Sequence, residues 1–236
     1  MTEPLVLLPG MMCDARLFAP QIVEFSRERA VMVAPITLGE RIEEIASNLL
    51  DQLPTRFALA GLSMGGIVAM ELLRRAPDRV SRLCLMDTDP LAETPQIAAM
   101  REPWIVRARA GRLSEVMREA MKPDFLAPGP GRSAILAQMY EMAADLGPDL
   151  FVRQSRALQR RTDQQGTLRK CRVPTLVLCG EHDRLTPVKR HSFMAELIPN
   201  ARLTIVPGAG HIPTLEQPGA VAEALADWLA QPFVLR

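Results

Sequence analysis

Long apolar segments are missing from this sequence. No apolar run approaches the roughly 18 residues that a membrane-spanning helix needs, although 48% of the 236 residues are hydrophobic. The first apolar run, at residues 5–8, follows no basic segment, is too short for the core of a signal peptide and is stopped by Pro9-Gly10. We therefore predict that this run is a β-strand, and we expect no membrane partner.

Cysteine and net charge are also low. The four cysteines show neither C-x-x-C spacing nor a pairing pattern; they are Cys13, Cys84, Cys171 and Cys179. Free thiols and a cytoplasmic location are the expectation for such a pattern. The formal net charge is only +1, which gives no general attraction to nucleic acid or to an anionic membrane surface, so we expect no nucleic-acid partner.

Short, almost wholly apolar runs alternate with helical patterns along the chain. Predicted strands lie at residues 5–8, 30–34, 57–62, 80–86, 174–179 and 203–206. Predicted helices start at Glu40, span 187–197, and finally carry Val221, Leu225, Trp228 and Leu229 on one face. Such strands are typical of a mostly parallel sheet with helices on both faces, so we predict an α/β fold with about six strands.

Residues 90–168 interrupt this alternation. They contain helical patterns at 97–109, 113–121, 134–144 and 149–160 and no convincing strand. We therefore predict a helical insertion over 90–168 between the fourth and fifth strands. Residues 1–89 and 169–236 then form the α/β core.

A glycine-rich turn marks the end of the third predicted strand. Its sequence is Gly61-Leu62-Ser63-Met64-Gly65-Gly66, and a helical run follows at 67–75. A sharp strand-to-helix turn of this kind exposes a serine hydroxyl beside a helix N-terminus. Gly61 and Gly65 stand two residues from Ser63, where a bulky side chain would clash. Ser63 is therefore the candidate nucleophile.

A serine hydroxyl needs a base to remove its proton, and the sequence has only three histidines. His211 lies in a loop of small residues after the last predicted strand, where ligand sites gather in open α/β sheets. His191 lies inside a predicted helix, and we expect it at the surface. His182 lies in the loop after the fifth strand. We favour His211 as the base.

The base in turn needs a carboxylate that fixes its tautomer. Asp183 is the preferred candidate, because it follows the fifth predicted strand and precedes a helix that starts with proline. Glu181 in the same loop and Asp87 after the fourth strand are the alternatives. Asp87 stands just before Thr88-Asp89-Pro90, where turn and helix-cap roles also explain an aspartate.

Four motifs together resemble the α/β-hydrolase superfamily over essentially the whole chain. They are Leu7-Leu8-Pro9-Gly10, the turn at 61–66, Gly180-Glu181-His182-Asp183, and Gly210-His211 followed by Glu216-Gln217-Pro218. The resemblance implies that Ser63 is the nucleophile, Asp183 the acid and His211 the base. It implies no metal and no organic cofactor.

The resemblance also implies an oxyanion hole and a cap. The backbone N–H groups of Met11 and Met64 would bind the oxyanion, and residues 90–168 would form the cap. Many relatives have His-Gly where this chain has Pro9-Gly10, a change that keeps the backbone donor. The chain also starts close to its first strand, so the N-terminal hairpin that is common in the superfamily is not expected.

The implied activity is that of a serine hydrolase with a small-molecule acyl substrate. It would cleave a small carboxylic ester, thioester or lactone through an acyl-enzyme on Ser63. A non-catalytic or single-turnover ligand receptor of the same fold, and a carbon–carbon bond hydrolase, are the alternatives.

Two groups of cap residues have two interpretations each. The methionines Met100, Met117, Met121, Met139 and Met142 suit an adaptable apolar pocket, or they pack the helices together. The arginines Arg153, Arg156, Arg160 and Arg161 suit an anionic group of a substrate, or they form a solvated helix face.

Overall fold

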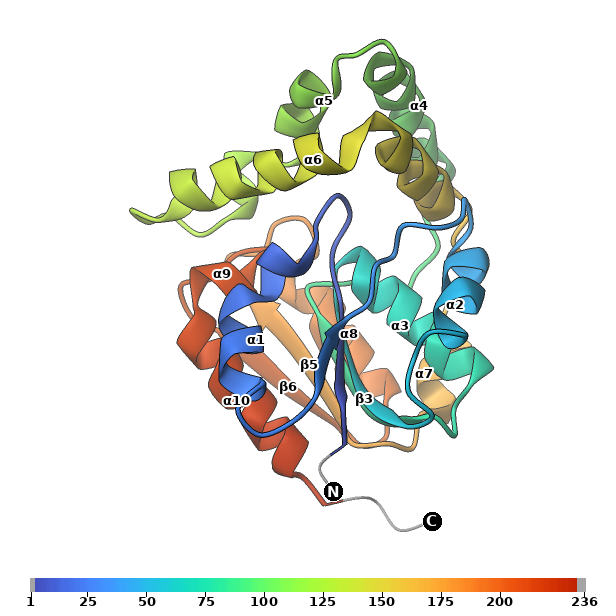
Figure 1. Ribbon diagram of the computed structural model, residues 1–236, viewed down its shortest axis with the longest axis vertical. Helices are drawn as coiled ribbons and strands as arrows, with labels where there is room; N and C mark the ends of the chain where they lie inside the picture. The colour runs from blue at the N-terminus through green and yellow to red at the C-terminus, as the bar shows by residue number, and fades with distance from the viewer. Residues whose placement is uncertain (1–2, 233–236) are drawn as a thin grey trace.

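The structure, a computed structural model, describes residues 3–232 (Figure 1). Residues 1–2 and 233–236, the two ends of the predicted core, lie outside the described residues. Six strands form one sheet in the order β2-β1-β3-β4-β5-β6, and every neighbouring pair is parallel. The strands are β1 (Leu5–Leu8), β2 (Val31–Val33), β3 (Phe57–Leu62), β4 (Val80–Met86), β5 (Thr175–Gly180) and β6 (Ala201–Val206). The predicted parallel sheet is confirmed.

At the two edges of the sheet the strand ends differ from the prediction by one or two residues. β2 covers only three residues, and β6 begins at Ala201, two residues before the predicted run at 203–206. Ala201 and Arg202 pair with Thr175 and Leu176 of β5 although the edge strand is largely not buried. An apolar run marks the buried part of a strand, whereas backbone pairing defines its length.

Side chains of β1 alternate between two separate buried clusters. Val6 and Leu8 join the cluster of α2 (Ile42–Leu50), α3 (Met64–Arg75) and α8 (Val188–Leu197). Leu5 and Leu7 join the cluster of α1 (Ala19–Phe25) and α10 (Pro218–Ala230). Because successive side chains of a strand point to opposite faces, helices cover both faces of the sheet, as predicted (Figure 1).

Several short helices were not predicted. α1 has seven residues and follows the 3₁₀ turn η1 (Ala15–Phe18), whose first turn is capped by the Asp14 side chain. The others are η2 (Pro123–Phe125), α7 (Gln165–Lys170) and α9 (Pro213–Glu216). Segments of one or two turns are too short for helical periodicity to identify them, because they depend on tertiary packing.

Between β4 and β5 the described chain contains helices and no strand. α4 (Pro95–Arg109), α5 (Leu113–Ala120) and α6 (Arg132–Gln159) lie together above one end of the sheet (Figure 1). α6 is kinked at Gly147, whose φ is 80°, and Pro148 follows without a backbone N–H. Its two arms correspond to the helices expected at 134–144 and 149–160.

Apolar packing joins this helical segment to the rest of the molecule. Met139 and Met142 of α6 belong to the same buried cluster as Leu5 and Leu7 of β1. A third cluster joins Met12, which follows β1, to residues of α4, α5 and α6. The helical segment is therefore packed directly on the loop that leaves the first strand.

Two expectations from composition can be compared with the structure. The four cysteines are buried, unpaired thiols, as predicted. Within residues 3–232, no helix has both the length and the apolar character needed to cross a bilayer.

Candidate active site

Ser63 stands between the end of β3 and the start of α3, with φ of 53° and ψ of −116°. Serine rarely adopts a positive φ, so the surrounding structure must hold the turn. The Ser63 N–H donates to the carbonyl of Met86 at 2.9 Å, and its own carbonyl accepts the N–H of Gly66 at 3.0 Å. The sharp turn predicted from the glycine-rich segment is present.

The glycines of this turn make room for close backbone contacts. A Cβ on Gly61 would lie 2.3 Å from the carbonyl oxygen of Gly65, and one on Gly65 would lie 2.1 Å from that of Leu8. A Cβ on Gly66 would lie 2.7 Å from the side chain of Thr88, whose hydroxyl donates to the Ser63 carbonyl at 2.7 Å. The absence of side chains at these positions is what allows Ser63 to stand at the edge of the sheet.

The side chains of Ser63, His211 and Asp183 form one continuous hydrogen-bonded chain. The Ser63 Oγ lies 3.0 Å from His211 Nε2, and His211 Nδ1 lies 2.9 Å from Asp183 Oδ2. The three residues follow β3, β6 and β5, at the carboxyl edge of the sheet where ligand sites form in open α/β folds. The structure thus brings the three predicted residues together at distances suited to proton transfer.

The Asp183 carboxylate is saturated with hydrogen bonds. Oδ1 accepts the N–H groups of Leu185 at 2.8 Å and Thr186 at 3.0 Å, and Oδ2 accepts the Thr186 hydroxyl at 2.6 Å. Burial raises the pKa of Asp183, but the charge of His211 and the hydrogen bonds from His211 and Thr186 outweigh burial and hold that pKa below its usual value. Asp183 is therefore ionised and faces the Nδ1 of His211, which favours the tautomer with a free lone pair on Nε2.

A second carboxylate, Glu216 of α9, holds the His211 loop. Its Oε2 accepts the N–H groups of Gly210 at 2.9 Å and Ala127 at 2.7 Å, and its Oε1 accepts the N–H of Ile212 at 2.9 Å. The backbone on both sides of His211 is therefore fixed by one side chain. The sequence analysis noted Glu216 only as part of a motif; its position at i+5 from His211 was the available signal.

Asp87, one alternative acid, lies next to this chain of hydrogen bonds but is not a member of it. One of its oxygens is within 4.8 Å of the ligand atoms of Asp183 and His211. Its Oδ1 accepts the N–H of Gly180 at 2.9 Å, and its Oδ2 has no hydrogen-bond partner in the part of the chain that the structure describes. Asp87 is fully buried and has a φ of 43°, which agrees with the turn role suggested by the sequence, whereas the helix that follows is capped by Thr94. Burial, followed by the charge of Asp183, raises the pKa of Asp87 well above its usual range.

Glu181, the other alternative acid, is exposed and faces another loop residue. Its Oε2 accepts the N–H of Gly208 at 3.2 Å. His182 is also exposed, with its Nε2 3.7 Å from Glu181. Neither residue takes part in the hydrogen bonds that join Ser63 to Asp183.

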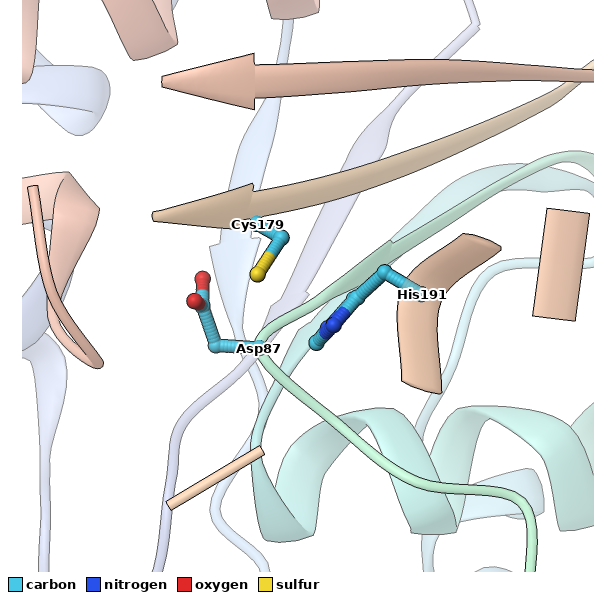
Figure 2. A group of neighbouring side chains, drawn as sticks. All are labelled: Asp87, Cys179 and His191. Carbon is cyan, nitrogen blue, oxygen red and sulfur yellow. The ribbon is translucent and has the colours of Figure 1, made fainter. Parts of the chain in front are cut away.

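The expected surface position of His191 is wrong. His191 is fully buried in α8 and lies beside Asp87 and Cys179 (Figure 2). Its Nε2 accepts the N–H of Thr88 at 3.0 Å. Burial lowers the pKa of His191 to about 4, so the ring is neutral. The sequence VKRHSFMAEL of this helix buries only two residues, too few for a periodic pattern to reveal the inner face.

The group of Asp87, Cys179 and His191 has the atom types of metal ligands, within 4.8 Å of one another (Figure 2). The His191 Nε2 lone pair is occupied by the N–H of Thr88, and the Cys179 Sγ donates to the Gly180 carbonyl at 3.1 Å. Burial, followed by the charges of Asp87 and Asp183, raises the pKa of Cys179, so the thiolate that a metal would bind is costly to form here. These side chains do not fit a metal ion.

The two N–H groups expected to form an oxyanion hole lie near Ser63. Met64 is the first residue of α3, where N–H groups have no acceptor within the helix. Met11 follows Gly10, and a Cβ on Gly10 would lie 3.6 Å from the Cβ of Ser63. Among residues 3–232, neither N–H donates to another protein group.

The expected cap side chains are mostly engaged in structural contacts. Met117, Met121, Met139 and Met142 are buried, whereas Met100 is 62% exposed. The four cap arginines differ in their contacts. Arg153 donates to the Thr37 carbonyl, Arg156 pairs with Glu102, Arg160 lies 3.5 Å from Glu40, and burial lowers the pKa of Arg161.

Comparison with known proteins agrees with this geometry. The sequence matches the alpha/beta hydrolase family over residues 5–224. It is 30% identical over 206 residues to a pimeloyl-[acyl-carrier protein] methyl ester esterase of Aromatoleum aromaticum, and the match covers 80% of each chain. It is 24% identical over 242 residues to a putative carbamate hydrolase of Pseudomonas savastanoi, covering 95% of this chain and 93% of the relative.

Solved structures show the same fold. A thermophilic esterase from Thermogutta terrifontis, solved with malate bound, has a TM-score of 0.88 and 27% sequence identity and covers 96% of this chain and 89% of its own. An enol-lactonase from Burkholderia xenovorans has a TM-score of 0.86 at 22% identity, covering 98% and 92%. Because the family match spans nearly the whole chain, from residue 5 to residue 224, this chain belongs to the alpha/beta hydrolase family.

Proposed function

We propose that this protein is a carboxylic ester hydrolase that works through an acyl-enzyme on Ser63. The observation that supports the proposal most is the unbroken hydrogen-bonded chain from Asp183 through His211 to the Ser63 hydroxyl. Relatives named as esterases support the reaction class. Each residue of the chain then has one role: Ser63 is the nucleophile, His211 the base and Asp183 the acid that orients His211.

In the proposed acylation step, His211 Nε2 takes the hydroxyl proton as Ser63 Oγ attacks the acyl carbonyl carbon. The negative charge that develops on the carbonyl oxygen is bound by the N–H groups of Met11 and Met64, each contributing on the order of 3 kcal/mol. Collapse of the tetrahedral intermediate breaks the bond to the alcohol oxygen, which receives the proton from His211. Asp183 stays ionised and stabilises the imidazolium in between.

In the deacylation step, a water molecule is the nucleophile and the Ser63 Oγ is the leaving group. His211 removes a proton from a water molecule, which attacks the acyl-enzyme carbonyl, and the Ser63 Oγ leaves with that proton. The products are a carboxylic acid and an alcohol, and His211 returns to its neutral form. This sequence uses only groups of the chain and water.

The proposed substrates are small acyl compounds. Esters are favoured because the matched relative of Aromatoleum aromaticum is named for a methyl ester substrate. Thioesters and lactones present the same acyl carbonyl to Ser63 and remain in the same substrate class. We propose that residues 90–168 form a cap over the site and determine which acyl chains are accepted.

Covalent labelling and turnover test this function. A fluorophosphonate probe should add to Ser63 as shown by peptide mass mapping, and Ser63→Ala should neither be labelled nor hydrolyse p-nitrophenyl esters. Sustained turnover after the burst supports an enzyme. A single stoichiometric burst would instead support a ligand receptor, and labelling of another residue would refute the role of Ser63.

A panel of acyl substrates identifies the bond that is cleaved. Esters, thioesters, lactones and a diketone substrate of a carbon–carbon bond hydrolase are compared at equal concentration, with Ser63→Ala as the blank. The highest kcat/KM among the oxygen esters is expected. Activity confined to the diketone would overturn the proposed ester specificity while keeping the same nucleophile.

A further inference from the structure

Among the four cap arginines, Arg161 is the one whose guanidinium has neither a hydrogen bond nor an ion pair with the described part of the chain. It lies two residues after the end of α6, and its Nε is buried without a partner among residues 3–232. Burial lowers the pKa of Arg161. Because a guanidinium stays charged in a protein, and a buried charge without a partner costs free energy, this side chain is suited to bind an anion.

The carboxylates near Arg161 are already paired with other arginines. Four charged side chains act on it: Glu93, Asp89, Arg101 and Arg190. The Glu93 carboxylate lies 2.5 Å from the Arg101 guanidinium, and both side chains are mostly buried. The Asp89 carboxylate lies 3.7 Å from the Arg190 guanidinium. Three arginines facing two carboxylates leave one positive charge, which matches one singly charged anion.

This cluster of five charged residues borders the proposed active site through two contacts. Nη1 of Arg101 lies 4.0 Å from Sδ of Met11, the residue whose N–H is proposed to bind the oxyanion. Asp89 directly follows Thr88, whose hydroxyl donates to the Ser63 carbonyl at 2.7 Å. An anion bound in the cluster and an acyl group on Ser63 can therefore belong to one substrate molecule.

We propose that Arg161 binds a carboxylate at the far end of the acyl chain, so that the preferred substrates are monoesters of dicarboxylic acids. The inference rests on the proposed function, because it adds a second anchor to the acyl group that Ser63 attacks. A planar guanidinium offers two parallel N–H donors to a carboxylate. One carboxylate also supplies the single negative charge that the cluster lacks.

Matched pairs of methyl esters test the inference. Methyl hydrogen succinate, glutarate and adipate are compared with methyl butyrate, valerate and hexanoate, which have the same chain lengths without the carboxylate. The wild type should have a kcat/KM about 10- to 100-fold higher for the anionic member of at least one pair, as expected for a charge-assisted hydrogen bond. The difference should appear mainly in KM, because the anchor binds substrate and transition state alike.

Two variants with the same change in charge assign the preference to one arginine. Arg161→Met removes the guanidinium and keeps a long side chain. Arg160→Met makes the same change at the neighbouring residue, which lies 3.5 Å from Glu40. The preference for the anionic ester should disappear in Arg161→Met and persist in Arg160→Met. Comparing two esters on one variant cancels a general loss of activity.

Two results would contradict the proposal in different ways. A wild type without any preference, or an equal loss of preference in both variants, would overturn the role of Arg161. Absence of hydrolysis of every ester by the wild type, with Ser63→Ala as the blank, would refute the proposed function instead.

Stability separates a binding role of Arg161 from a structural one. Replacing an unpaired buried charge by an apolar side chain does not remove a stabilising contact, so the urea midpoint of Arg161→Met should equal or exceed that of the wild type. A lower midpoint than that of Arg160→Met, or failure to fold by circular dichroism, would show that Arg161 supports the fold and would overturn the inference. Arg161→Lys keeps the charge without the two parallel donors, so it should retain part of the preference.

Discussion

At the scale of single residues, the two aspartates next to His211 differ in their hydrogen bonds and in the direction of their pKa shifts. Asp183 accepts hydrogen bonds at both oxygens and has a lowered pKa, whereas Asp87 has one unpartnered oxygen among the described residues and a raised pKa. An ionised carboxylate is needed to stabilise the imidazolium. The geometry therefore supports Asp183 as the acid.

Neutral isosteres at both positions test this choice. Asp183→Asn leaves His211 in the wrong tautomer, and kcat should fall on the order of 10³–10⁴-fold. Asp87→Asn preserves an acceptor for Gly180 and should lower kcat far less. Steady-state kinetics with circular dichroism as the folding check gives the ranking, and the reverse ranking would transfer the role of acid to Asp87.

Burial of His191 should make the protein sensitive to acid. As pH falls below about 6.5, the unfolded chain binds a proton at this residue, but the folded chain does not until about 4. The stability that the neutral ring provides is therefore fully present above pH 6.5. About 3 kcal/mol of the free energy of unfolding is lost as the pH falls from 6.5 to about 4. Urea unfolding from pH 7 to pH 4 should show a smaller loss in His191→Gln than in the wild type.

His182→Gln is the control for that measurement, because His182 is exposed. Its stability should follow the wild type across the whole range. The activity of His191→Gln near pH 7 should also remain close to wild type, since His191 is not part of the chain from Ser63 to Asp183. An unchanged pH dependence in His191→Gln would show that another group causes the acid sensitivity.

At the scale of elements, the strand-to-helix turn depends on a backbone contact between β1 and α3. A Cβ on Gly65 would lie 2.1 Å from the Leu8 carbonyl oxygen, a distance that only backbone movement can relieve. Gly65→Ala should therefore lower the free energy of unfolding by more than about 3 kcal/mol. Gly129→Ala, where a Cβ meets nothing within 4 Å, should be nearly neutral; similar losses in both would contradict the clash.

The connection between β6 and α9 depends on Glu216. Replacement by glutamine leaves one acceptor oxygen for three N–H groups, so Glu216→Gln should lower stability by about 1–3 kcal/mol. The kcat should fall as well, because these N–H groups flank His211. Denaturant unfolding and steady-state kinetics measure both effects. Glu223→Gln, at an exposed position of α10, is the matched control and should change neither quantity.

At the scale of the whole molecule, the segment between β4 and β5 contacts both loops of the proposed site. The His211 N–H donates to the Phe125 carbonyl at 2.7 Å, and Glu216 binds the N–H of Ala127. Gln154 holds the turn after β1 from the other side. The proposed cap is therefore also a support for the groups that we propose carry out the reaction.

Apolar packing across this boundary should contribute strongly to stability. Met139 is 5% exposed and packs in the cluster that includes strand residues, whereas Met100 on α4 is 62% exposed. Met139→Ala should lower the free energy of unfolding by about 2–5 kcal/mol, and Met100→Ala by less than about 0.5 kcal/mol. Denaturant unfolding measures both. Equal, small effects would mean that the helical segment is packed only loosely on the sheet.

Local patterns in the sequence were sufficient to predict the parallel sheet and the turn at Ser63. Strands buried on both faces are apolar at every position, and a strained strand-to-helix turn requires glycine at fixed offsets, so both leave a signal in consecutive residues. The short helix α1 and the ends of β2 and β6 left no such signal, because their positions depend on contacts with distant residues.

The sequence by itself determined which residues were candidates, since it supplied one turn serine, three histidines and a few loop carboxylates. Only the tertiary structure distinguished Asp183 from Asp87, showed that His191 is buried and placed Gln154 against Met12. The physical reason is that charge state, burial and hydrogen bonding belong to the surroundings of a side chain. Those surroundings come from segments as far as 142 residues apart, and no local pattern records them.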